Sequence, residues 1–117
     1  MRDRSELTLR NQRDFSRVYN KGKSRGSRFV VVLYNKNRLG YTRTAFVASK
    51  KVGNSVQRNR SRRLMREAYR SLEKKVMPGY DIIFVARAGI DDHKEGEVER
   101  CVKKALDDCG LLKKASD

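Results

Sequence analysis

The segment between Lys50 and Arg70 constrains this chain more than any other. It holds eight lysines and arginines and a single acid, Glu67. Asn54 can cap a helix that begins at Ser55, because its side-chain oxygen can accept a hydrogen bond from a first-turn backbone amide. At 100° per residue, the apolar side chains of this helix gather on one side. They are Leu64, Met65, Ala68, Tyr69 and Leu72. We therefore predict a helix with one buried face.

The opposite side of the predicted helix carries arginines at intervals of four residues, with Asn59 and Arg63 beside them. The series is Arg58, Arg62, Arg66 and Arg70. Like charges at this spacing repel by about 0.2–0.5 kcal/mol per pair in an isolated helix. Planar guanidinium groups fit phosphate oxygens better than a lysine ammonium does. The pattern therefore predicts a polyanionic partner; the alternative is a solvated, highly charged face that binds nothing.

The charge of the whole chain is distributed unevenly. The 117 residues have a formal net charge of +15, with twenty cations and four anions in residues 1–70 but nine cations and ten anions in residues 71–117. This asymmetry predicts one basic surface and an acidic partner. The length suits a single domain that needs no metal or disulfide to fold. We expect residues 1–117 to form one domain, with flexible tails at 1–10 and 111–117.

Neither a membrane segment nor a metal site is expected. No apolar run approaches the roughly 20 residues that span a bilayer, and the N-terminus lacks the apolar core of a signal peptide, so we expect a cytoplasmic protein. Cys101 and Cys109 should lie on one helix, about 12 Å apart along its axis, too far to bridge. We expect reduced core thiols. His93 is the only histidine, which leaves no metal-ligating set and no cofactor bound by the protein alone.

A short helix is predicted between the capping residue Asn11 and Gly22, with an apolar stripe of Phe15, Val18 and Tyr19. Two aromatic rings at this spacing belong to a core more often than to a ligand platform. Residues 21–28 follow as a cationic loop rich in glycine and serine, which we expect to be flexible.

Three apolar runs have the length and composition of strands: 29–34, 44–48 and 81–86. The first two should form an antiparallel pair, and a last helix is predicted over 94–109. The resulting order is helix, strand, strand, helix, strand, helix. It predicts an α/β (α+β) two-layer sandwich with one small mixed sheet and helices mainly on one face.

Such a small sheet would leave part of its other face uncovered. If the first helix lies across that face, Phe15 and Tyr19 would form a shallow apolar cleft with a row of strand side chains, flanked by cations. Aromatic rings beside cations suit unstacked single-stranded nucleic acid, because stacking contributes about 1–3 kcal/mol per base.

Residues 49–67, which include Arg58-Asn59-Arg60, closely resemble the Arg-Asn-Arg motif of the bacterial ribonuclease P protein component. Other recurrent segments of that family are matched elsewhere in the chain, so the resemblance covers roughly residues 7 to 110. They are Asp14-Phe15 with Tyr19 and Gly22, the strand at 29–34, and residues 80–87.

The resemblance implies a single RNA-binding domain that acts as the protein subunit of ribonuclease P, an endonuclease that removes the 5′ leader from precursor tRNA. It implies that the catalytic centre and its Mg2+ belong to the RNA subunit and that no protein residue is catalytic. The partners implied are the catalytic RNA and precursor tRNA. The family also implies a left-handed βαβ crossover, although such connections are nearly always right-handed.

Two groups of binding residues follow from the resemblance. The RNA-binding group is Lys50, Lys51, Asn54, Arg58, Asn59, Arg60, Arg62, Arg63 and Arg66. The group that lines the leader cleft is Phe15, Tyr19, Phe29 and Leu33. An aromatic residue is more usual in the family at the position of Leu33, and a register slip of one residue would exchange the two faces of this strand.

Three alternatives were weighed. A non-enzymatic RNA-binding ribosomal or RNA-assembly protein could use the same arginine helix. A nuclease acting by itself would need clustered carboxylates or a histidine and lysine pair, and the acids here are scattered around the last helix. A binder of double-stranded DNA would need a dimerising heptad or a helix-turn-helix pair, which the sequence lacks. We therefore expect no DNA partner.

Overall fold

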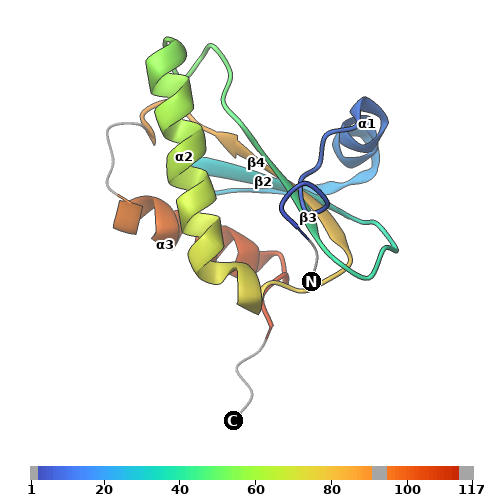
Figure 1. Ribbon diagram of the computed structural model, residues 1–117. Helices are drawn as coiled ribbons and strands as arrows, with labels where there is room; N and C mark the ends of the chain where they lie inside the picture. The colour runs from blue at the N-terminus through green and yellow to red at the C-terminus, as the bar shows by residue number, and fades with distance from the viewer. Residues whose placement is uncertain (1–2, 91–94, 114–117) are drawn as a thin grey trace.

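The chain folds into two layers, as a computed structural model describes for residues 3–90 and 95–113 (Figure 1). Two long helices cover one face of a four-stranded sheet, and a short helix lies on the other side. The elements are α1 (Gln12–Lys21), β1 (Lys23–Gly26), β2 (Val30–Lys36), β3 (Arg43–Val47), α2 (Ser55–Leu72), the 3-10 helix η1 (Glu73–Lys75), β4 (Tyr80–Ala86) and α3 (Glu95–Asp108). The predicted α+β sandwich is confirmed.

The strand order is β1-β2-β4-β3, so the predicted antiparallel pairing of residues 29–34 with 44–48 is wrong. β4 lies between these strands, antiparallel to β2 and parallel to β3. Its Ile82, Ile83 and Phe84 are completely buried. A strand that is apolar on both faces is best placed in the centre of the sheet, and this outweighs the nearness of β2 and β3 in sequence.

The predicted loop at 21–28 contains an edge strand instead. Residues of β1 are all exposed, but their backbone pairs with β2, with Lys23 opposite Tyr34 and Gly26 opposite Val31. The sequence of this strand has no apolar pattern, because the strand joins the sheet through backbone hydrogen bonds alone. From β3 the chain passes through α2 to the parallel neighbour β4; the left-handedness of this crossover stays a prediction.

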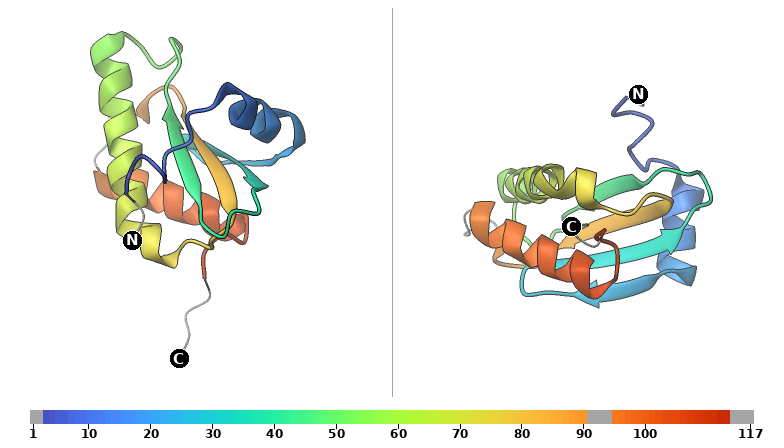
Figure 2. Two further views of the ribbon diagram at one scale, coloured as in Figure 1. Left: turned by 45° about the vertical axis from the view of Figure 1, so that its right-hand side comes forward. Right: turned by 90° about the horizontal axis from the view of Figure 1, so that it is seen from below.

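Side chains of β4 alternate between two apolar clusters, as the pleat of a strand requires. Ile82 and Phe84 join the main cluster beneath α2 and α3. Ile83 joins a smaller cluster with Val18 of α1 and Leu9, against which Val85 packs. Figure 2 shows the helices α2 and α3 side by side over the sheet, with α1 set apart from them. The second face is therefore covered only in part.

The described parts of the predicted flexible tails pack on the domain. Leu9 is 3% exposed, and its amide donates to the carbonyl of Thr44 at 2.8 Å. Leu111 is 1% exposed and its carbonyl accepts from the amide of Met77 at 2.7 Å. The expectation of flexible tails is therefore wrong for these residues, because isolated apolar side chains in polar segments can still fill a core. Residues 1–2 and 114–117 lie outside the described part.

A charged cluster holds α1 on the sheet. Arg43 of β3 donates from Nε and Nη2 to the carboxylate of Asp81 at 2.9 and 2.8 Å, and from Nη1 to Asp14 of α1 at 3.2 Å. Asn37 donates a further hydrogen bond to Asp81 at 2.9 Å. Asp81 is 2% exposed. The hydrogen bonds with Asp81 raise the pKa of Arg43, so this guanidinium stays charged. The cluster links α1, β3 and β4.

Replacing Asp81 with asparagine should lower the free energy of unfolding by about 3 kcal/mol, because it leaves a partly buried guanidinium with one weaker partner. Urea denaturation measures this loss. The control is Glu73→Gln, which breaks an exposed pair with Arg4 and should cost no more than about 1 kcal/mol. Equal losses in the two variants would contradict the proposed role of the cluster.

Candidate nucleic-acid interface

The arginine helix α2 begins at the predicted cap Asn54, and the structure shows that this cap is reciprocal. Asn54 Oδ1 accepts from the backbone amide of Gln57 at 2.9 Å, and Gln57 Oε1 accepts from the amide of Asn54 at 2.8 Å. Gly53 precedes the cap with φ of +146°, and a β-carbon there would lie 1.9 Å from Gln57 Oε1. The side-chain oxygen of Asn54 therefore serves the helix, and the cap fixes where the first arginines lie.

The arginine series winds around α2 instead of following its outer side. Each step of four residues turns the helix by about 400°, so the series drifts by about 40° per step. Arg58, Arg62 and Arg66 are half-buried, whereas Arg70 is exposed. The prediction that all four lie opposite the buried face is corrected: the series begins beside that face and reaches the outer side at Arg70. The other predicted RNA-binding residues are exposed. They are Lys50, Lys51, Asn54, Asn59, Arg60 and Arg63.

Four carboxylates of the described residues pair with arginines outside α2. Asp14, Asp81, Glu73 and Asp108 all lie within ion-pair distance of an arginine in another part of the chain. Those arginines are Arg4, Arg17, Arg25 and Arg43. Within residues 3–90 and 95–113, five arginines of α2 have no carboxylate at this distance. They are Arg58, Arg62, Arg63, Arg66 and Arg70. Their charges remain available to a ligand.

Neutral contacts order several of these arginines. Arg58 Nη2 lies 3.3 Å from Ser55 Oγ, and Arg62 Nη2 donates to Asn59 Oδ1. The Arg66 guanidinium lies 5.7 Å from the centre of the Phe46 ring. Such contacts preserve the positive charge while restricting the side chain, and a restricted cation loses less entropy when it binds.

A cavity of about 340 Å³ lies between the N-terminal segment, β3 and α2. Arg66 and Arg70 line it from α2, Phe15 from α1, and Phe46 from β3. Tyr69 forms part of the wall, and burial raises the pKa of its hydroxyl. The arginine series and the first aromatic residue of the predicted cleft therefore border the same cavity.

Of the predicted cleft residues, three lie on the α1 side of the sheet. Phe15 and Leu33 are half-buried against the smaller apolar cluster, and Tyr19 is 50% exposed. Phe29 belongs to the main cluster on the opposite face and is 7% exposed. Its placement in the cleft is wrong, because it lies in the turn between β1 and β2, where strand alternation does not apply.

Two further side chains, which the sequence did not single out, belong to this surface. Val47 of β3 and Val85 of β4 are partly exposed and pack beside Leu33 on the same cluster. They are also paired across the sheet in the register of β3 and β4. In each strand the valine follows a phenylalanine, Phe46 or Phe84, so the alternation of a strand predicts that valine and phenylalanine face opposite sides of the sheet. The correct strand order was still needed to place the two valines next to α1.

Both cysteines are free and half-buried, so the expectation of core thiols is only partly correct. His93 lies outside the described residues. Within the described ranges, no group of three histidine, cysteine or acidic side chains is placed to hold a metal ion. None of the helices described there combines the length and apolar character needed to cross a membrane.

Comparison with known proteins shows the family of this chain. The family model for ribonuclease P matches residues 4–110. The chain belongs to this family. The ribonuclease P protein component of Clostridioides difficile (strain 630) is 41% identical over 99 residues, covering 84% of this chain and 87% of its relative. That of Thermoanaerobacter sp. (strain X514) is 45% identical over 103 residues, covering 88% and 89%.

Solved ribonuclease P proteins share the fold. The Staphylococcus aureus protein superposes with a TM-score of 0.81 at 29% identity, covering 92% of this chain and 98% of that one. The Thermotoga maritima protein has a TM-score of 0.74 at 28% identity, covering 94% and 98%. Ribonuclease P proteins therefore share the fold of this chain at low sequence identity.

Replacing Asn54 with alanine should lower the free energy of unfolding by about 1 kcal/mol, because an N-cap hydrogen bond is lost. Serine at this position keeps an oxygen that can accept from Gln57 and should restore most of the loss. Thermal unfolding of the two variants measures the difference. Equal destabilisation by serine and alanine would show that the cap does not stabilise α2.

Proposed function

We propose that this chain is the protein subunit of a ribonuclease P holoenzyme, which binds the catalytic RNA through α2 and the 5′ leader of precursor tRNA beside α1. The observation that carries the proposal is the row of five α2 arginines without carboxylate partners among the described residues, of which Arg66 and Arg70 line the same cavity as Phe15. The printed name shared by the relatives, ribonuclease P protein component, supports the same role.

The contact with the catalytic RNA is electrostatic in this proposal. Lys50 and Lys51 in the turn before α2, with the arginines that follow, would bind phosphates and release counterions from the RNA. Guanidinium groups can form two parallel hydrogen bonds with one phosphate, which also orients the protein. Arg63 and Asn59 are exposed on the outer side of α2 and can be reached by RNA without any rearrangement.

The leader contact combines stacking with charge. Tyr19 projects from α1 with half of its surface exposed, and Phe15 lies one turn earlier beside the sheet. Leu33, Val47 and Val85 supply an apolar floor. An unpaired strand could stack bases on these rings while its phosphates meet the cations at the cavity.

The bond-breaking step is assigned to the RNA subunit and its Mg2+. Three acidic side chains already serve the fold: Asp14 and Asp81 bind Arg43, and Glu73 binds Arg4. The protein would position the substrate and neutralise phosphate charge. Purified protein with Mg2+ should leave precursor tRNA intact, and RNA-free cleavage would contradict this assignment.

Replacing Arg58, Arg62 and Arg63 with glutamine should weaken binding of the ribonuclease P RNA and flatten its salt dependence. Each lost phosphate contact should reduce the slope of log affinity against log salt by about 0.7–0.9. The matched control replaces Arg38, Lys74 and Lys75, three cations that line none of the cavities described. An α2 variant with the same slope as this control would refute the phosphate contacts.

Replacing Tyr19 with alanine should weaken binding of precursor tRNA to the holoenzyme by about 1–3 kcal/mol, because one stacked base loses its platform. Mature tRNA should bind unchanged, and Tyr19→Phe should retain the affinity for the leader. Competition binding with the two RNAs measures the difference. Equal effects on both RNAs would mean that this ring does not contact the leader.

A further inference from the structure

A second cavity lies near the edge of the sheet opposite the one at β3. Its volume is about 290 Å³, and it is lined by the turn between β1 and β2 and by α3. β1 and β3 are the two outer strands, so this cavity and the one beside β3 lie at opposite edges. The proposed function assigns no role to it.

Cations dominate the rim of this second cavity. Arg28 lines it from the turn, and Arg100 and Lys104 line it from α3, against one acid, Glu97. Within the described residues, none of the three cations has a carboxylate at ion-pair distance. Arg100 and Lys104 lie one helical turn apart, where like charges repel.

Two acids of α3 contact residues outside this cavity. Asp108 lies 3.7 Å from Arg25 of β1, and Glu99 accepts a hydrogen bond from Ser71 of α2 at 2.8 Å. A helix that carries more acids than bases thus presents its cations to this cavity. The Arg28 guanidinium lies 5.1 Å from the centre of the Phe29 ring, which holds the charge near the cavity without neutralising it.

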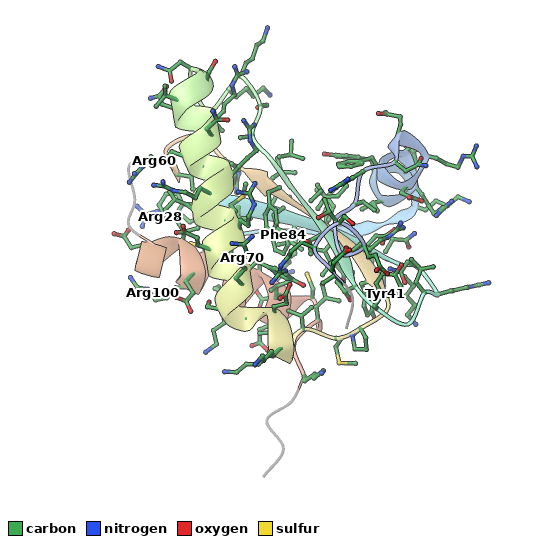
Figure 3. The ribbon with its side chains drawn as sticks, in the orientation of Figure 1. Arg28, Tyr41, Arg60, Arg70, Phe84 and Arg100 are labelled. Atoms are coloured by element: carbon green, nitrogen blue, oxygen red, sulfur yellow. The ribbon has the colours of Figure 1, made fainter. Side chains whose placement is uncertain are left out.

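α2 also directs a cation to this side of the molecule. Ser71, which touches α3, lies three turns after Arg60, so both residues are on the same flank of α2. Figure 3 shows Arg60, Arg28 and Arg100 along one side of the molecule, from α2, the turn and α3. The basic surface of α2 therefore continues toward the second cavity.

We propose that this surface, formed by Arg28, Arg100 and Lys104, binds phosphates of a second segment of the ribonuclease P RNA. The inference rests on the proposed function and extends it, since the RNA would contact both edges of the sheet. Charge complementarity selects RNA as the occupant: three cations without carboxylate partners among the described residues surround a concave site, with Phe29 and Cys101 as its apolar wall.

The two cysteines provide a direct test. Cys101 lines the second cavity, whereas Cys109 lies beside Tyr34 in a different one. Burial raises the pKa of Cys109. The labelling of each cysteine in the presence of RNA is therefore measured against the labelling of the same cysteine without RNA. Iodoacetamide labelling of the full chain, with and without the ribonuclease P RNA transcript, should show protection of Cys101 that exceeds the protection of Cys109. Equal labelling of Cys101 in both conditions would overturn the inference.

Charge removal tests the same surface without labelling. A variant with Arg28, Arg100 and Lys104 replaced by glutamine should reduce the salt slope for the transcript by about 2, the loss expected for three phosphate contacts. In the control, glutamine replaces Arg38, Lys74 and Lys75. This control removes the same charge and should change the slope by less than half as much.

The outcomes separate the two proposals. If the α2 variant lowers the slope but the Arg28, Arg100 and Lys104 variant matches the control, this inference fails and the proposed function stands. If neither variant differs from the control, the proposed function and this inference both fail. Protection of Cys101 together with the lowered slope supports the inference.

Discussion

The distribution of carboxylates decides what this molecule can bind. Asp81 and Asp14 neutralise Arg43 inside the fold, and their charges hold α1 against the sheet. Within the described residues no such partner reaches five arginines of α2, of which three are half-buried; the five are Arg58, Arg62, Arg63, Arg66 and Arg70. The mutual repulsion of these arginines is tolerated because the apolar side chains of α2 are anchored in the main apolar cluster. A polyanion would stabilise such a helix further, which links the packing of the core to the proposed binding of RNA.

The architecture separates the two kinds of contact that the proposal needs. α2 lies on the face with the large core, and α1 lies on the face with the small one. β3 runs between them at the edge of the sheet, so residues from both helices meet at one cavity. Charge from one helix and aromatic surface from the other can therefore act on a single RNA strand, while the edge at β1 remains open for a second segment.

Features with a strong local signal were predictable from sequence. The cap at Asn54, the buried stripe of α2 and the apolar strand at β4 all follow from helix chemistry or periodicity. The antiparallel pairing of β2 with β3 was wrong because strand order depends on competition for the centre of the sheet. β1 was missed because its pairing involves only the backbone. Phe29 was misplaced because the strand begins one residue later than its apolar run, at Val30.

The most direct test of the central claim is arginine footprinting with phenylglyoxal, read by mass spectrometry, on the full chain with and without the ribonuclease P RNA. If the α2 arginines bind phosphates, RNA should slow modification of Arg62, Arg63 and Arg66 severalfold and leave the exposed Arg38 unchanged. Modification of the α2 arginines at the same rate in both conditions, with RNA shown to be bound, would contradict the account.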